Sequence, residues 1–204
     1  AQPNCCPDCG PSLTLKNSRG EIVARRDEAL LETARLLRSG QIVAVQGIGG
    51  FHLLCDAALD STVVRLRVAK RREHKPFAVL FPSLEAVRQV CEVSEVEARL
   101  LCGSEAPITL LKRRAMPASR SPAISGQIAP GIPSLGVLLP YTPLYHLLAQ
   151  ELGVPLVATS GNRSEEPICL TENEARGKLG DITEFFLIHD RPIACRVDDS
   201  VVRE

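Results

Sequence analysis

Aromatic side chains are scarce in this chain of 204 residues: they make up 3% of it, and Trp is absent. The core must therefore be built from aliphatic side chains, and a surface that stacks nucleic-acid bases is not expected. The formal net charge is zero, so the chain as a whole does not attract a polyanion over long range. No apolar run of about 18 residues and no signal-peptide pattern occurs. These absences predict a protein with no membrane segment and argue against a nucleic-acid partner; together with the lack of a disulfide framework, they predict a cytoplasmic protein.

A disulfide framework of the secreted kind is also missing. Five of the eight cysteines are scattered along apolar or helical segments, and only Cys5, Cys6 and Cys9 cluster. Cys6 and Cys9 form a Cys-x-x-Cys knuckle, which is half of a four-thiolate zinc site. Because no second knuckle follows, a complete site needs Cys5, a distant cysteine, another chain or residues upstream. We predict that residues 1–12 are the remnant of a zinc-finger-like region in an excised fragment, and that zinc belongs to the full-length protein.

Short apolar strands alternate with helical segments along the rest of the chain. This order predicts an α/β fold in which helices pack on a twisted mixed sheet, as a single compact domain over residues 13–204. Asp27 is the expected N-cap of the first helix, and Ser94 with Glu97 forms the capping box of a later one. Residues 112–133 are rich in Ser, Pro, Ala and Gly and predict a long functional loop or lid. The expected strands are 13–16, 42–45, 51–55, 76–81, 108–111, 135–139, 155–158 and 184–188.

The densest chemical signal is the basic segment from Lys70 to Pro76. Four of its side chains are cationic, and they lie where a helix ends and a strand begins. Lys70 and Arg72 are two residues apart, so their side chains can point the same way once the backbone is extended. Such a cluster can hold a phosphate group. It can equally be a solvated basic face that stabilises the end of a helix.

A second signal, from Thr159 to Asn162, follows an apolar strand directly. Ligands in open α/β sheets bind beyond the carboxyl ends of strands, and a Ser-Gly-Asn turn offers a hydroxyl, an amide and closely approachable backbone donors. Ser160 and Asn162 are therefore candidate binding residues. The alternative is an ordinary turn that ends a strand.

Two further segments could contact a small substrate. The turn from Gly47 to His52 lacks the Lys-Ser or Lys-Thr of a Walker loop, but Gly49 and Gly50 could let a substrate approach the backbone, and His52 is either a ligand donor or a structural histidine. Asp198 and Asp199 could help position a magnesium-bound nucleotide or could belong to a charged surface turn. The sequence contains no Ser-His-Asp, Cys-His or metal-hydrolase constellation.

Taken in order, these segments resemble the YrdC-like domain of HypF carbamoyltransferases and threonylcarbamoyl-adenylate synthases. The shared pattern is a Lys-x-Arg, here Lys70 and Arg72, followed far downstream by a Ser-x-Asn, here Ser160 and Asn162. Four segments are similar to the HypF branch in particular, and together they extend the resemblance from Cys6 to the end of the chain: 6–11, 47–53, 139–144 and 196–201. The resemblance implies that an acylphosphatase-like domain, a zinc-finger-like region and a C-terminal transferase domain complete the full-length enzyme.

The resemblance also implies a reaction. Carbamate attacks the α-phosphorus of ATP, carbamoyl-adenylate forms and pyrophosphate leaves, with Mg²⁺ bridging the phosphates. The nucleophile is already an anion, so positive charge and positioning suffice and no general base is needed. Lys70 and Arg72 would then be catalytic, Gly49, Gly50 and His52 would contact substrate, and the metal knuckle would be Cys6 and Cys9. The nucleotide would be bound by Ser160, Asn162, Arg191 and Arg196. The product would pass to the transferase domain and, with a HypE-type partner, supply cyanide ligands for nickel–iron hydrogenase.

Three alternatives remain open at this point. A threonylcarbamoyl-adenylate synthase for tRNA modification would keep the fold and change the acceptor, although the Cys-x-x-Cys remnant and the Gly-Gly-Phe-His segment argue against it. A double-stranded-RNA-binding module is suggested by the basic cluster and opposed by the zero net charge. The fragment could also be a scaffold between neighbouring domains that binds no ATP.

Overall fold

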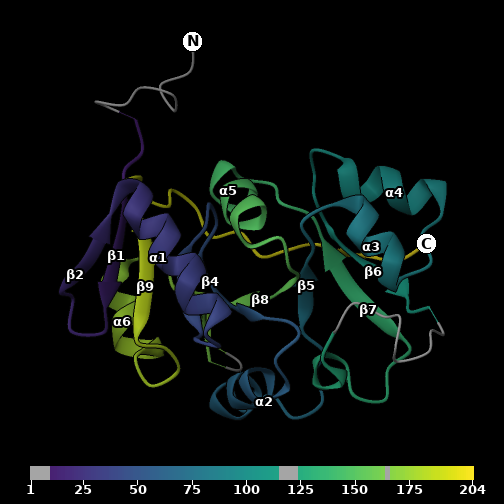
Figure 1. Cartoon of the computed structure of the whole chain (residues 1–204), viewed down its shortest axis with the longest axis horizontal. Helices are drawn as coiled ribbons and strands as arrows, with labels where there is room; N and C mark the ends of the chain where they lie inside the picture. The colour runs from purple at the N-terminus through teal and green to yellow at the C-terminus, as the bar shows by residue number, and fades with distance from the viewer. Residues whose placement is uncertain (1–9, 115–123, 164–165) are drawn as a thin grey trace.

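The computed structural model describes residues 10–114, 124–163 and 166–204, and within these ranges the strands form one ten-stranded sheet (Figure 1). Its order is β10-β6-β7-β5-β8-β4-β3-β9-β1-β2. The β3–β9, β5–β7 and β6–β10 pairs are parallel and the others antiparallel, so the sheet is mixed as expected. The strands are β1 (Leu13–Asn17), β2 (Ile22–Arg25), β3 (Val43–Gln46), β4 (Phe51–Asp56), β5 (Ala78–Leu80), β6 (Ile108–Lys112), β7 (Ser134–Leu138), β8 (Leu156–Ser160), β9 (Phe185–His189) and β10 (Val201–Val202).

Six α-helices and one 3₁₀ turn accompany the sheet in the described ranges: α1 (Arg26–Arg38), α2 (Asp60–Ala69), α3 (Leu84–Val90), α4 (Glu95–Cys102), η2 (Gly126–Ile128), α5 (Pro143–Leu152) and α6 (Glu172–Leu179). Side-chain oxygens accept backbone N–H groups at the start of four helices, which satisfies donors that a helix leaves unpaired. These caps are Ser83, Ser94, Thr142 and Thr171.

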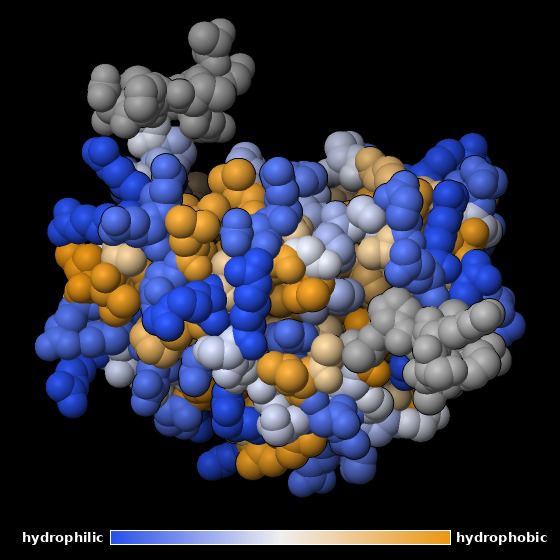
Figure 2. All heavy atoms as spheres, in the orientation of Figure 1, coloured by the Kyte–Doolittle hydropathy of each residue, from blue (hydrophilic) through white to orange (hydrophobic). Residues whose placement is uncertain are grey.

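Helices cover both faces of the sheet, because the strands are apolar on both sides. Val43 and Val45 of β3 pack in one hydrophobic cluster with α1 and α5, while Ala44 between them packs in another with α2, α3, α4 and α6. Figure 1 shows α1 and α5 together in front of the strands. In Figure 2 the apolar side chains on that face form small groups among charged ones. The described ranges contain no helix of the length and apolarity that a bilayer span requires.

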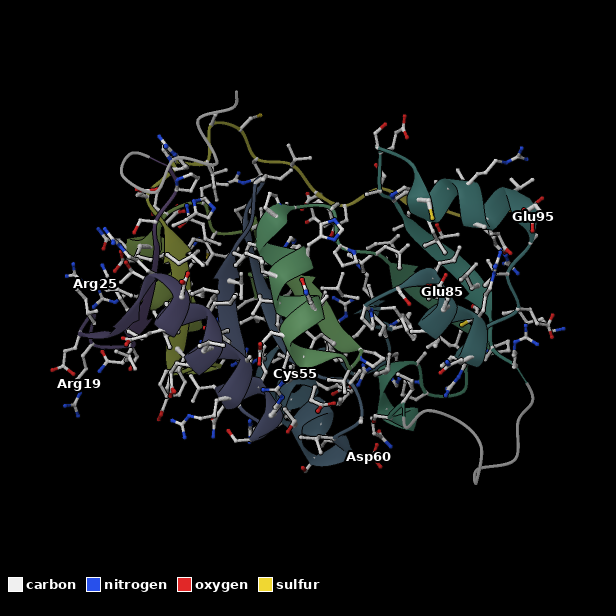
Figure 3. The ribbon with its side chains drawn as sticks, turned by 45° about the horizontal axis from the view of Figure 1, so that its top comes forward. Arg19, Arg25, Cys55, Asp60, Glu85 and Glu95 are labelled. Carbon is white, nitrogen blue, oxygen red and sulfur yellow. The ribbon has the colours of Figure 1, made fainter. Side chains whose placement is uncertain are left out.

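Four features differ from the sequence predictions. The prediction that Asp27 caps the first helix is wrong: α1 begins at Arg26 after Arg25, and Asp27 lies in the first turn, where its charge suits the helix dipole. Strands β2 and β10 were not expected. Part of the predicted 112–133 loop is ordered, because η2 follows Ser125, which donates a hydrogen bond to Asp60 at the start of α2, labelled in Figure 3. Cys6 and Cys9 lie outside the described residues, as do residues 115–123 of that loop.

Strand β8 pairs antiparallel with both β4 and β5, so the end of β8 lies beside the starts of β4 and β5, and the site is at these strand ends in the middle of the sheet. Ser160, the last residue of β8, lies opposite His52 near the start of β4, and Ala158 lies opposite Ala78 at the start of β5. The basic segment that precedes β5 therefore lies beside the turn that follows β8. Helix α2 ends at Ala69 and delivers Lys70 to the same place.

Candidate functional site

A hollow of about 510 Å³ lies where the basic segment meets the turn after β8. It brings together the two pairs of residues that the sequence pattern singled out, although about ninety positions of chain separate them. Its lining consists of Lys70, Arg71, Arg72, Glu73, His74, Lys75, Ser160 and Asn162. No apolar side chain is among them, so the hollow suits a charged ligand.

Lys70 is buried at the base of the hollow, with 2% of its surface exposed. Its Nζ donates hydrogen bonds to the carbonyl oxygens of Ser160 at 2.5 Å and Asn162 at 2.8 Å, and it lies 3.2 Å from Asn162 Oδ1. Burial, with help from Arg72, lowers the pKa of Lys70 to about 7. The three oxygens favour the ammonium form over the neutral amine. A buried cation is thus locked to the Ser160–Asn162 turn.

Arg72 lies between the basic segment and β8. Its Nε and Nη2 donate to the carbonyl oxygens of Lys75 at 3.1 Å and Pro76 at 2.5 Å, and Nη1 lies 3.3 Å from Thr159 Oγ1. The guanidinium also stacks on Phe77, 5.0 Å from the ring centroid. Burial and the nearby charge of Arg67 lower its pKa. Lys70 and Arg72 therefore both point toward the end of β8 and not into bulk solvent.

The turn after β8 is held by its own side chains and by a close backbone approach. Ser160 Oγ donates to Asn162 Oδ1 at 2.7 Å, and Asn162 Nδ2 donates to the carbonyl oxygen of Glu166 at 2.6 Å. A Cβ on Gly161 would lie 2.6 Å from the carbonyl oxygen of Phe51. Glycine is needed here because the turn packs directly on the backbone of β4.

The glycines before β4 have the same kind of role. A Cβ on Gly49 would lie 2.6 Å from the carbonyl oxygen of Val197, and one on Gly50 would lie 2.4 Å from Ile168 Cδ1. Val197 and Ile168 therefore occupy the space beside these glycines that a side chain would need. Neither glycine lines the hollow. Their assignment as substrate contacts stays a prediction that this hollow does not support.

His52 is held in a buried polar network on the α5 side of the sheet. Its Nδ1 lies 2.5 Å from Tyr145 Oη and its Nε2 lies 3.7 Å from Asp199 Oδ2. Burial lowers the pKa of His52 and raises that of Tyr145, which favours the neutral form of each side chain. The contact with Asp199 places the segment before β10 beside the start of β4. These contacts favour the structural interpretation of His52, which does not line the hollow.

Arg191 and Arg196 lie on the segment that leaves β9, and both are exposed. The carbonyl oxygen of Arg191 accepts from Gln46 Nε2 at 2.9 Å. Neither arginine is among the residues that line the hollow, so a role in nucleotide binding would require a ligand that extends beyond it. Among the described residues, Asp198 and Asp199 do not form a group of three or more potential metal ligands with their neighbours.

Arg67 is a functional candidate that the sequence reasoning missed. Only 9% of its surface is exposed, although it carries a guanidinium on α2. It stacks on Phe77, with Cζ 4.7 Å from the ring centroid, and donates to backbone carbonyls of the basic segment. A signal was present, because an arginine on the apolar, inward-facing side of a helix is rarely left without partners.

Comparison with known protein families identifies the family to which the chain belongs. The Sua5/YciO/YrdC family model, described as "Telomere recombination", matches residues 35–204. The chain belongs to the Sua5/YciO/YrdC family. The match includes both halves of the hollow, so the site is built from residues that lie within the family's shared region.

Within the Sua5/YciO/YrdC family, the resemblance to the HypF branch is confirmed. The chain is 46% identical over its whole length to "Carbamoyltransferase HypF" of Rhodobacter capsulatus and 44% identical over 94% of its length to that of Synechocystis. It spans about a quarter of the length of these curated relatives. A crystal structure of full-length HypF in a phosphate- and nucleotide-bound form matches the whole chain, with 44% identity, a TM-score of 0.89 and 26% of that chain covered. The α/β fold with one mixed sheet is thereby confirmed.

The threonylcarbamoyl-adenylate synthases are less similar to this chain than the HypF proteins are. "Threonylcarbamoyl-AMP synthase" of Bos taurus is 31% identical over 182 residues, which cover 86% of this chain and 63% of that protein. The identity to the HypF proteins is higher, which favours that branch.

Proposed function

We propose that this domain catalyses the ATP-dependent formation of carbamoyl-adenylate from carbamate, as one step of carbamoyl transfer. The observation that carries the proposal is the hollow in which Lys70, Arg72, Ser160 and Asn162 meet. Its polar, cationic lining suits the triphosphate of ATP. The relative with bound phosphate and nucleotide, at 44% identity over the whole chain, supports the same ligand class.

In the proposed step a carbamate oxygen attacks the α-phosphorus of ATP. The bond between the α-phosphorus and the oxygen that bridges to the β-phosphorus breaks, and its electrons leave on pyrophosphate. Lys70 and Arg72 offset the negative charge on the phosphates, and the Ser160–Asn162 turn positions the nucleotide. ATP enters as its magnesium complex, in which the phosphates supply ligands for the ion. Carbamate needs no deprotonation, so the step runs without a catalytic base.

In the whole enzyme we propose that an acylphosphatase-like domain supplies carbamate from carbamoyl phosphate and that a transferase domain consumes the adenylate. The end use would be cyanide synthesis for hydrogenase maturation with a HypE-type partner. This proposal rests on the resemblance to HypF and on the fraction of those proteins that the chain spans.

Isotope exchange between pyrophosphate and ATP tests the proposed reaction. We expect exchange when freshly dissolved ammonium carbamate is supplied and none when it is omitted, because the adenylate must form before the reaction can reverse. A parallel sample with threonine and bicarbonate tests the alternative function, the synthesis of threonylcarbamoyl-adenylate. The 31% identity to a threonylcarbamoyl-AMP synthase is the reason to test it. A strict requirement for threonine would replace our proposal with that function, and no exchange in either sample would exclude both.

The lowered pKa of Lys70 predicts a pH-dependent affinity for ATP. The ammonium prevails below about pH 7 and the neutral amine above it, so phosphate binding should weaken as pH rises through that value. Between about pH 7 and pH 9 the affinity for magnesium–ATP should fall by up to about tenfold per unit. Calorimetric titration at several pH values measures this. The control is the K70R variant, whose guanidinium stays charged; a pH profile shared by both proteins would assign the loss to another group.

A further inference from the structure

The guanidinium of Arg67 organises the backbone of the basic segment. Its Nη1 donates to the carbonyl oxygens of Arg72 at 2.6 Å, Glu73 at 3.2 Å and Lys75 at 3.1 Å. Its Nε and Nη2 donate to the carbonyl oxygens of Gln127 and Ile128, in the ordered part of the 112–133 loop, at 2.7 to 3.2 Å. One buried cation thus turns the carbonyl groups of the basic segment inward, toward α2.

This arrangement fixes the direction of two backbone donors. In a planar trans peptide the N–H group points opposite to the C=O group of the same unit. The carbonyls of Arg72 and Glu73 point to Arg67, so the N–H groups of Glu73 and His74 point away from it. Both residues line the hollow, whereas Arg67 does not. Across the described ranges, no protein group accepts a hydrogen bond from either N–H.

We propose that the backbone N–H groups of Glu73 and His74 bind a phosphate group of the substrate, and that Arg67 is the positioning residue that holds them in place. Neighbouring N–H groups that converge on one point form an anion-binding concavity. The surrounding charge agrees, because Lys70, Arg71 and Lys75 line the same hollow. This inference rests on the proposed function for the identity of the anion, and it adds donors to that site beyond the Lys-x-Arg and Ser-x-Asn residues.

The Glu73 carboxylate, which also belongs to the hollow's lining, does not oppose this reading. Its side chain is 87% exposed and its Oε2 lies 3.9 Å from His74 Nε2, so it extends into solvent beside an exposed imidazole. Solvent screening makes its repulsion of an anion small. The two N–H groups belong to a backbone that Arg67 holds, whereas the side chains of Glu73 and His74 extend into solvent.

Amide chemical shifts test the donors directly. The probe is inorganic pyrophosphate, titrated into the ¹⁵N-labelled chain. We expect the amide protons of Glu73 and His74 to move downfield on saturation, as N–H groups do when they gain a charged acceptor. Saturable binding that leaves both resonances in place would overturn the proposal. Because pyrophosphate binding needs no chemistry, this result is separate from the exchange assay: a protein that binds through these N–H groups but forms no adenylate would refute only the proposed reaction.

The positioning role is tested with Arg67→Lys, which keeps the charge and the aliphatic stem but loses the forked donor geometry. We expect its pyrophosphate affinity to fall roughly tenfold or more, because hydrogen bonds to a charged group are lost, and its Glu73 and His74 shift changes to shrink. The matched control is Arg65→Lys on the same helix, whose guanidinium donates to the Gly40 carbonyl at 2.6 Å, away from the hollow. Thermal unfolding of both variants checks the fold. Wild-type affinity in a folded Arg67→Lys protein would contradict the role.

Discussion

Replacing Lys70 by Met should reduce carbamate-dependent pyrophosphate exchange by roughly 10²- to 10³-fold, the cost of removing one preorganised donor from a charged transition state. The side chain is the buried cation of the hollow, and its Nζ donates to the carbonyl oxygens of both Ser160 and Asn162. Methionine has a similar length and no charge. The variant therefore removes charge from the phosphate site and also releases the turn after β8. Initial rates of exchange at saturating ATP give the measurement.

The control for this variant is Lys16→Met, which removes a partly buried lysine elsewhere in the fold. Lys16 forms an ion pair with Glu172 at 2.9 Å and lies on β1, outside the hollow. We expect this variant to keep its exchange rate, while any change in thermal unfolding reports the loss of a partly exposed pair. If Lys70→Met retained a rate within about threefold of the wild type, electrostatic stabilisation by this residue would have to be abandoned.

Gly161→Ala should destabilise the protein and disable the site together. The added Cβ would meet the carbonyl oxygen of Phe51 at 2.6 Å and its Cβ at 2.7 Å, so the turn must move away from β4. The Gly161 N–H also donates to the Phe51 carbonyl, and its own carbonyl accepts from Cys169. A forced contact between two backbones costs about 1–3 kcal/mol of unfolding free energy. Chemical denaturation measures that loss, and ATP titration measures the displacement of Ser160 and Asn162.

Gly177→Ala is the matched substitution without the contact. Gly177 lies on α6, and a Cβ there would meet nothing within 4 Å. Alanine should raise the unfolding free energy by about 0.5–1 kcal/mol, since glycine is a poor helix residue. Each variant adds one methyl group, and the two are predicted to shift the free energy of unfolding in opposite directions. Equal effects would show that the approach of the turn to β4 is not the cause.

The elements could be predicted from local pattern where that pattern was strong. The apolar run after Pro155 is bounded by turns and forms β8, and the capping box at Ser94 begins α4. Strand β2 was missed because Ile22 and Val23 are exposed on an edge strand and follow a polar turn. Strand β10 has two residues and no periodicity to detect. The strand order was beyond reach, since nothing near Phe185 indicates that β9 lies between β3 and β1.

The candidate site could be predicted only in part, for reasons that differ between residues. Lys70 and Ser160 carry side-chain chemistry at the ends of elements, so a pattern could pair them. The place of Arg67 on the inward-facing side of α2 marks it as a buried cation, but its partners are backbone carbonyls, which every residue has, so no side-chain pattern identifies them. Gly49 and Gly50 were ambiguous because glycine serves close packing as readily as ligand approach. The structure shows their close packing against Val197 and Ile168, and their contact with substrate stays a prediction.

The position of β9 has a consequence for how the polypeptide is made. Strand β9 pairs with β1 on one side and β3 on the other, and within the described ranges β2 pairs with β1 alone. A ribosome builds Leu13–Arg25 first and Phe185–His189 last among these partners. The β1–β2 hairpin must therefore wait for nearly the whole chain before its inner edge is covered. Pairings so distant in sequence slow folding, and an uncovered hairpin edge is a template for aggregation. Newly made chains should thus need protection from chaperones until residue 189 has emerged.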